Sequence, residues 1–191
     1  EEPISEPVIV RSHFVTTVLV SHNGATWLPA VLTQLARTTR PPEVIVGVDA
    51  RSTDTSLEIL TQSLGADRVV ALAENQGFGA CVDAGLGLVP RPDFLADARP
   101  ADTIEWIWLL HDDCAPDSTA LEQLLLTADR HPSVAVLGPK ILGWHDRRLL
   151  LEVGVGITSD GRRVTGLERG EHDQGQHDGE RDVLARSESA R

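Results

Sequence analysis

The sequence predicts an α/β domain in which a mostly parallel sheet is flanked by helices on both faces. Short β-branched and apolar segments alternate at least four times with segments whose apolar residues recur at helical spacing. Two of the strand-like segments, 14–20 (FVTTVLV) and 44–48 (VIVGV), are apolar on both faces, as in strands that are covered on both sides. Because the links are short, this alternation favours right-handed crossovers and parallel strands.

The first part of the chain predicts two strand–helix units. Residues 14–20 form the first strand, and the polar residues 22–24 (HNG) end it. Residues 27–38 form a helix because leucine and valine recur on one of its faces, and two prolines follow it. Residues 44–48 form the second strand, and residues 52–54 (STD) offer a cap for the next helix.

The same alternation continues through the middle of the chain. We expect a short third strand at 69–72, then a glycine-rich turn and a helix over 74–88. The segment 104–110 (IEWIWLL) predicts the fourth strand. A helix over 118–130 and a fifth strand at 134–137 complete the predicted sheet.

The domain organisation that we expect has three parts. Residues 1–12 form an extended lead-in, and residues 13–166 form the binding domain. Within its last part, 149–157 reads as extended, and the Asp-Gly pair at 160–161 predicts a hairpin. Residues 167–191 are rich in charge, glycine and histidine, which predicts a polar flexible tail.

Composition narrows the class of protein. Apolar residues make up 41% of the 191 residues, as in a globular domain, and the net charge is −12. Nucleic acid is not an expected partner, since that would need basic patches to meet phosphates. A phosphate-bearing ligand is not excluded, because a bound cation can lie between carboxylates and a diphosphate. No apolar run approaches the roughly 18 residues of a membrane span.

Polar side chains follow each predicted strand at its carboxyl end, where open α/β sheets bind ligands. A purely structural sheet would not require this arrangement. The candidate ligand-binding residues are Ser21, His22, Asn23, Asp49, Arg51, Ser52, Asn75, Gly77 and Asp112.

The adjacent carboxylates of Asp112 and Asp113 are the strongest of these signals. They repel each other, so their placement after a very apolar strand favours a hard cation, Mn²⁺ or Mg²⁺, with Asp113 as its ligand. A purely structural interpretation stays open, in which Asp113 or Asp117 caps the next helix. Asp49 could likewise be a carboxylate that only stabilises a turn.

Three other patterns weigh less. The segment 77–82 (GFGACV) lacks the third glycine of a dinucleotide fingerprint, and the link after the first strand has one glycine, so a dehydrogenase is disfavoured. The same link, 21–27 (SHNGATW), has no Lys or Arg, which disfavours a nucleotidyltransferase. The histidines and acidic residues of 171–178 (EHDQGQHD) could bind a metal, but we expect them to form a solvated tail.

Taken together, residues 15–155 resemble the family 2 inverting glycosyltransferases of GT-A fold, especially the rhamnosyl- and galactofuranosyltransferase-like branch. Segment 44–56 (VIVGVDARSTDTS) is similar to the family's "VDxxSxDxS" motif, and 74–86 (ENQGFGACVDAGL) to its "NxGfaxaxNxG" motif. Segment 108–117 (WLLHDDCAPD) resembles its "DxD" metal motif, with His111 in place of the first Asp. These segments stand in the family's order.

The resemblance implies a role for several of these residues. Asp49 would bind the nucleobase, and Asp54 would organise the turn that follows it. Asp112 would contact the ribose or the sugar, and Asp113 would hold the metal.

The resemblance also implies the reaction. A sugar would pass, with inversion, from a nucleoside-diphosphate sugar to the hydroxyl of a glycan or glycolipid acceptor in cell-wall biosynthesis. We expect a cytoplasmic protein acting at the inner face of the membrane, with any membrane attachment of the parent protein lying outside these residues.

The family's general base follows the metal motif at a distance, and no residue of this chain matches it. We therefore expect a chain truncated before the acceptor region, with the catalytic residue unknown. The alternative function is a non-catalytic nucleotide-sugar-binding module that needs a partner or a continuation.

Overall fold

The computed structural model describes residues 11–89, 102–154, 156–160, 162–164 and 167–178. The chain divides into two compact units. One comprises Val10–Glu122 and is called the N-terminal unit here; the other contains the residues from Gln123 onward and is called the C-terminal unit. Within the described residues, no helix has the length and apolar character needed to cross a bilayer.

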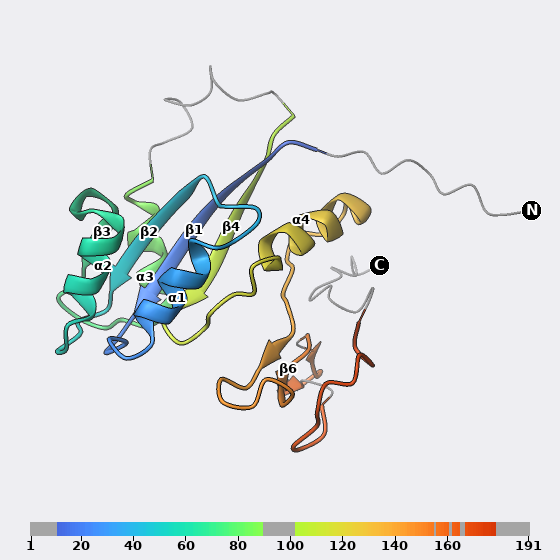
Figure 1. Ribbon diagram of the computed structural model, residues 1–191. Coiled ribbons are helices and arrows are strands. Elements are labelled where there is room, and N and C mark those ends of the chain that lie inside the picture. Colours follow the sequence, from blue (N-terminus) through green and yellow to red (C-terminus); the bar gives the residue numbers. More distant parts are fainter. Residues whose placement is uncertain (1–10, 90–101, 155, 161, 165–166, 179–191) are drawn as a thin grey trace, which may run out of the picture. The chain divides into compact units, whose positions relative to one another are not determined.

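The N-terminal unit contains a four-stranded parallel sheet in the order β3-β2-β1-β4 (Figure 1). Its strands are β1 (His13–Ser21), β2 (Val44–Asp49), β3 (Val69–Ala71) and β4 (Ile104–His111). The helices that link them are α1 (Leu28–Leu35), α2 (Ser56–Leu64) with the short η1 (Ala66–Arg68), and α3 (Phe78–Leu86). The predicted sheet, its parallel strands and its flanking helices are confirmed.

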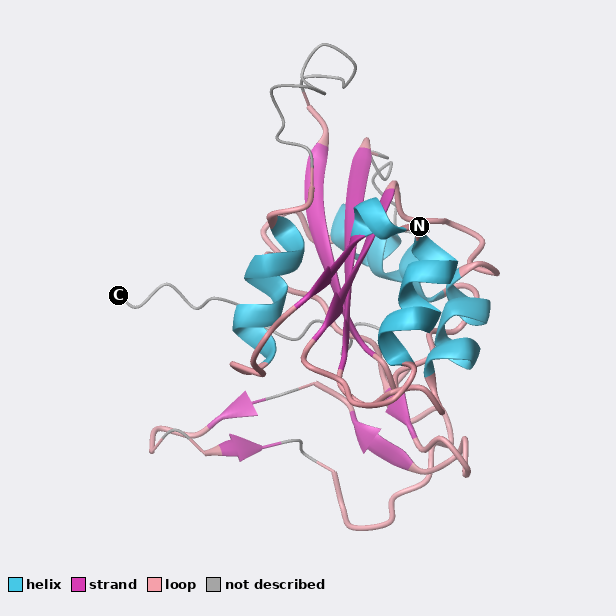
Figure 2. Cartoon of the chain, turned by 90° about the vertical axis from the view of Figure 1, so that its left-hand side faces the viewer, coloured by secondary structure: helices cyan, strands magenta, loops and turns pink. Residues whose placement is uncertain are grey.

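Strand residues alternate between two cores on opposite faces of the sheet. Val18 and Val46 pack with Cys81 of α3 on one face. Leu19 packs with Leu28 of α1 on the other face, together with residues of α2 and β4. Figure 2 shows the helices on both sides of the strands. This alternation explains why both faces of the central strands carry buried apolar side chains.

α3 approaches the sheet closely at one glycine. A Cβ atom on Gly85 would lie 2.8 Å from a methyl carbon of Val48 and 2.9 Å from one of Val18. Such distances are shorter than van der Waals contact, so glycine is required for the helix to lie this near the strands. The position of α3 also fixes where its first residues lie at the edge formed by the carboxyl ends of the strands.

The C-terminal unit has little regular structure. α4 (Ala120–Arg130) spans the boundary between the units, and β5 (Ile141–Leu142) pairs with β6 (Leu150–Glu152) in an antiparallel manner. β7 (Gly156–Ile157) pairs with β8 (Arg163–Val164), also antiparallel. This last pair confirms the hairpin that the Asp-Gly sequence predicts.

The predicted fifth strand at 134–137 is wrong. Residues 134–140 have no regular secondary structure, and Val136 is 53% exposed. The apolar run is only four residues long, and Pro139 directly after Gly138 has no N–H to donate to a ladder. Apolar composition alone therefore gave a false strand signal here.

Replacing Gly85 with Ala should lower the free energy of unfolding by about 1–2 kcal/mol, because the new methyl group overpacks the helix against Val18 and Val48. The matched control is Gly79→Ala in the same helix, where a Cβ would meet nothing within 4 Å. This control should be neutral or stabilising by up to about 1 kcal/mol. Urea denaturation of both variants measures the difference, and equal effects would contradict the close-packing argument.

Candidate functional site

The polar residues predicted from the sequence gather at the carboxyl ends of β1, β2 and β4. Asp49 ends β2, Ser21 ends β1, and Asp112 directly follows β4. Because β1 lies between β2 and β4, Asp49 and Asp112 are separated by two strand spacings, about 10 Å. The edge therefore holds two separate groups of polar atoms.

Asp112 is a buried carboxylate that is anchored by the end of β1. Its Oδ2 atom accepts hydrogen bonds from Ser21 Oγ and from the backbone N–H of His22, both at 2.8 Å. Only 4% of the residue is exposed. A Cβ atom on Gly24 would lie 2.1 Å from the same oxygen, so the loop after β1 can close over Asp112 only with glycine at this position.

The loops after β1 and β2 are joined into one structure by hydrogen bonds. Asn23 has a positive φ of 55°, its N–H donates to Ser52 Oγ at 2.9 Å, and its side-chain oxygen accepts from the N–H of Thr53 at 2.8 Å. His22 Nδ1 lies 2.8 Å from the carbonyl oxygen of Ala50. A carbonyl can only accept, so Nδ1 carries the proton in this contact.

Asp54 organises the turn before α2, which matches the role expected for it. It accepts hydrogen bonds from the backbone N–H groups of Ser56 at 3.0 Å and Ala25 at 3.1 Å. Partial burial would raise the pKa of Asp54, but these bonds and the one from the Ser56 hydroxyl outweigh it and lower the pKa below its ordinary value. The carboxylate is therefore ionised at neutral pH.

Asp49 has one satisfied and one unsatisfied oxygen. Oδ2 accepts from the backbone N–H of Ser52 at 3.0 Å, whereas Oδ1 is buried and has no hydrogen-bond partner within the described residues. The residue is 3% exposed. Burial, and then the charge of Asp49, raise the pKa of the Cys81 thiol, so this neighbour stays neutral. A buried carboxylate oxygen without a donor is costly.

The turn between β3 and α3 contributes Asn75 and Gly77. The side-chain oxygen of Asn75 accepts from the N–H of Gly77 at 3.0 Å, and Gly77 has a positive φ of 92° that favours glycine. Arg51, in the loop after β2, also has a positive φ, of 61°, and is exposed. Both loops border the same sheet edge, since β3 is the neighbour of β2.

Sequence reasoning missed Phe78. This residue begins α3, and its ring stacks on His111 with a centroid distance of 5.8 Å and an interplanar angle of 21°. Phe78 lay in a matched motif, but an aromatic residue at the start of a helix ordinarily signals core packing. Its exposed fraction of 40% shows that it lies mostly outside the core.

His111, Asp112 and Asp113 form the one group of potential metal ligands found within the described residues. One ligand atom from each lies within 4.8 Å of the others. His111 Nδ1 lies 2.9 Å from Asp112 Oδ1 and 3.2 Å from Asp113 Oδ1. Opposite ligands of a small octahedral cation are about 4 Å apart, so these residues fit such an ion with small adjustments. Asp113, with 63% of its side chain exposed, is more accessible than Asp112.

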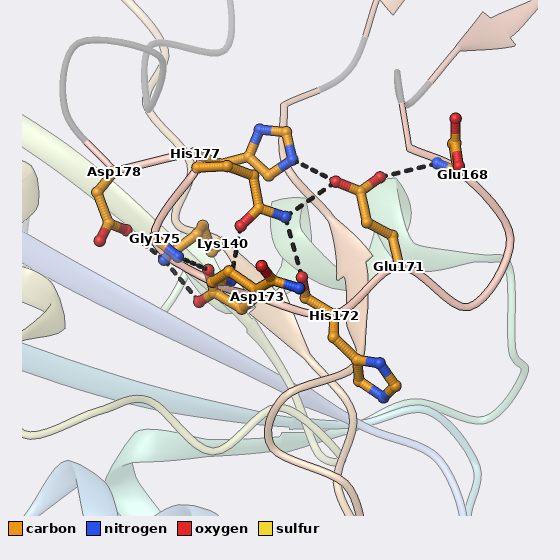
Figure 3. Close-up of polar contacts among 10 residues, drawn as sticks. Lys140, Glu168, Glu171, His172, Asp173, Gly175, His177 and Asp178 are labelled. Atoms are coloured by element: carbon orange, nitrogen blue, oxygen red, sulfur yellow. Dashed lines mark hydrogen bonds and ion pairs between the residues drawn. The ribbon is translucent and has the colours of Figure 1, made fainter.

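The segment expected to be a flexible polar tail has defined contacts as far as residue 178. The backbone N–H of Leu150 donates to the carbonyl of Glu171 at 2.9 Å, and that of Asp173 donates to Arg148 at 2.6 Å. Figure 3 shows the Glu171 carboxylate facing the backbone N–H of Glu168 and the ring of His177. The residues from 179 onward lie outside the described part of the chain.

Lys140, the one lysine in the sequence, forms ion pairs with two aspartates of this segment. Its ammonium group lies 2.7 Å from Asp173 Oδ2 and also contacts Asp178 (Figure 3). Burial alone would lower the pKa of Lys140, but its hydrogen bonds to both aspartates raise it above the ordinary value. The segment's acidic residues therefore bind a side chain of this chain, which accounts for their clustering without a metal.

This geometry defines an open α/β domain: a parallel sheet covered by helices on both faces, with polar loops gathered at the carboxyl ends of its strands. Residues 16–148 match the model of glycosyl transferase family 2. The chain belongs to this family.

Solved structures with a similar fold include S. aureus TarS. The structure of its residues 1–349 in complex with UDP has a TM-score of 0.48 and 16% sequence identity, covering 70% of this chain and 43% of that TarS chain. The complex with UDP-GlcNAc has the same TM-score and 17% identity, covering 70% of this chain and 42% of the other. This chain thus spans less than half the length of the TarS chains that it matches. A search of curated proteins found no match.

The contacts of Glu171 predict acid-dependent loosening of the 167–178 segment. Hydrogen bonds from the Glu168 N–H, from His177 and from Gln176 lower the pKa of Glu171 from 4.5 to about 2. Because the pKa is depressed in the folded state, the stabilisation is complete above about pH 4.5 and is lost as pH falls toward 2.

Hydrogen-exchange protection of the Leu150 and Asp173 amides should therefore fall over this pH range. Glu171→Gln should reduce protection already at pH 6 and weaken the pH step, whereas Glu168→Gln should change neither, because Glu168 contributes its backbone N–H. Protection that stays constant from pH 5 to pH 2.5 in the unmodified chain would contradict this account.

Proposed function

We propose that this chain binds the nucleoside-diphosphate sugar donor of an inverting, metal-dependent glycosyl transfer. The observation that carries the proposal is the buried, unpartnered Oδ1 of Asp49 at the sheet edge. It lies in a chain that belongs to glycosyl transferase family 2 over residues 16–148. Neither turn formation nor helix capping requires this oxygen, since Oδ2 alone fixes Ser52.

A nucleobase supplies the missing donor. Uracil and thymine each have one ring N–H, and guanine has a ring N–H beside an amino group. Any of these could donate to Asp49 Oδ1 and relieve the cost of burying an unsatisfied carboxylate oxygen. The loops after β1 and β2 would enclose the base, because Asn23, Ser52 and Thr53 already bind them to each other. His22, Arg51, Asn75 and Gly77 would line the rest of the donor site.

The diphosphate would lie toward the end of β4. Asp113 and His111 would hold Mn²⁺ or Mg²⁺ there, with Asp112 anchored behind them. When bound, the ion would act as a Lewis acid that stabilises the charge on the leaving phosphate. Asp112 would then act mainly by fixing the loop geometry, since Ser21 and His22 occupy its Oδ2 atom.

The transfer itself would invert the anomeric carbon. The oxygen of an acceptor hydroxyl forms a bond to this carbon while the bond to the diphosphate breaks on the opposite face, and a base removes the hydroxyl proton. We assign no residue of this chain as that base. For the acceptor we propose a cell-envelope glycan or glycolipid and, for the sugar, the rhamnosyl or galactofuranosyl class. A cytoplasmic location at the inner face of the membrane would give access to both substrates.

Calorimetric titration with UDP, dTDP and GDP, each with and without Mn²⁺, tests the donor site. One nucleotide should bind, and Mn²⁺ should strengthen that binding. Asp49→Asn should weaken it at least about tenfold, because the amide that accepts from Ser52 would present its NH₂ group to the base N–H. Asp113→Ala should remove the effect of Mn²⁺ and leave the metal-free affinity.

Asp67→Asn, in η1 beside the start of β3, is the matched control and should bind like the unmodified chain. Binding that is unaffected by Asp49→Asn, or absent for all three nucleotides, would contradict the proposal. Donor binding without sugar transfer to any acceptor would instead favour the non-catalytic binding module.

A further inference from the structure

Phe78 has a position that core packing does not explain. It begins α3, yet neither hydrophobic core cluster of the described residues includes it, although Cys81 and Val82 of the same helix belong to one of them. The residue is 40% exposed, and its ring stacks on His111. An exposed aromatic residue that contacts a potential metal ligand suggests a role at the site.

The backbone before α3 fixes where this ring lies. Gly77 is the N-cap residue of the helix with a φ of 92°, and Asn75 binds its N–H. The close contact of Gly85 with Val18 and Val48 fixes the axis of the helix. The ring of Phe78 is thus presented by a rigid helix from the turn after β3 to the end of β4.

His111 needs such a support. Half of its side chain is exposed, so nothing in its burial alone would fix the plane of the ring. With Phe78 stacked against one face, the ring keeps an edge directed at the carboxylates, with Nδ1 at 2.9 Å from Asp112 and 3.2 Å from Asp113. Ligand orientation by neighbouring groups commonly changes metal affinity by 10- to 100-fold.

We propose that Phe78 is a positioning residue that holds the His111 imidazole within the ligand set of the divalent cation. This inference rests on the cation site of the proposed function and extends it to cation selectivity. A ligand set that combines an imidazole with a carboxylate binds transition-metal ions such as Mn²⁺ more strongly, relative to Mg²⁺, than carboxylate ligands alone. The Phe78–His111 stack would therefore favour Mn²⁺ over Mg²⁺.

Titration of the chain with Mn²⁺ in the absence of nucleotide, followed by electron paramagnetic resonance, tests this role, and Mg²⁺ affinity follows from competition. Phe78→Ala should weaken Mn²⁺ binding about tenfold and Mg²⁺ binding less. Phe78→Tyr keeps the stacking ring and should restore the affinity. His111→Asn should lower the Mn²⁺/Mg²⁺ preference to a similar degree.

Spin-echo modulation of bound Mn²⁺ separates positioning from general structural support. Direct coordination by an imidazole gives a ¹⁴N coupling, which should be present in the unmodified chain and in Phe78→Tyr. The coupling should be absent in His111→Asn and reduced in Phe78→Ala. Leu57→Ala removes a similarly exposed apolar side chain from α2 and should change nothing. Phe78→Leu keeps apolar bulk without an aromatic face, and should behave like Phe78→Ala even if the alanine variant folds poorly.

The outcomes distinguish this inference from the proposed function. Equal Mn²⁺ affinity in the unmodified chain and in Phe78→Leu, or no ¹⁴N coupling in the unmodified chain, would overturn the role of Phe78 while leaving nucleotide binding intact. Phe78-dependent Mn²⁺ binding in a chain that binds no nucleotide would support the role and count against the proposed function. No Mn²⁺ binding to the unmodified chain would overturn both the role of Phe78 and the metal dependence.

Discussion

The buried carboxylate of Asp112 is the interaction on which the ligand-binding edge depends. A charged group in this position is expensive to bury unless its oxygens are hydrogen-bonded, and Ser21 and His22 supply two donors to one of them. These bonds join the end of β4 to the end of β1, and the loop after β1 is in turn joined to the loop after β2 through Asn23. Gly24 permits the arrangement, since any side chain there would collide with the carboxylate. Three loops that are distant in sequence thus form one rigid border.

Helix packing connects the core to this border. Gly85 lets α3 lie directly on β1 and β2, and the same helix begins with Phe78, which contacts His111 at the end of β4. The order of strands places β1 between β2 and β4, so Asp49 and the His111 cluster stay separated. Such a separation suits a ligand with two distinct ends, one that presents an N–H group and one that carries negative charge. The fold therefore sets the spacing of the two groups before any ligand binds.

Much of this was predictable because the determining signals are local. Apolar runs broken by polar residues predicted four parallel strands, and the carboxyl ends of those strands identified Asp49, Asp112 and Asp113. What the sequence could not predict depended on partners that are remote in sequence. The four apolar residues at 134–137 do not form a strand in the described chain, and the acidic segment after 167 is fastened by Lys140, which lies about 30 residues earlier. Likewise, no local sequence pattern predicts that Ser21 binds Asp112, or that Phe78 lies outside the core and stacks on His111.

The charge at the carboxyl ends of the strands bears on whether a diphosphate would need a metal ion to bind there. Arg51 is the one Arg or Lys in the links that follow the four parallel strands at this edge, whereas Asp54 and Asp113 are exposed acids in the same links. A diphosphate approaching the end of β4 would meet the carboxylate of Asp113 and its anchored neighbour Asp112, and repulsion between like charges would weaken its binding. A divalent cation reverses the sign of the field at that point and supplies open positions to the phosphate oxygens. The acidic character that argues against nucleic acid as a partner is therefore compatible with a diphosphate ligand, on the condition that the cation binds with it.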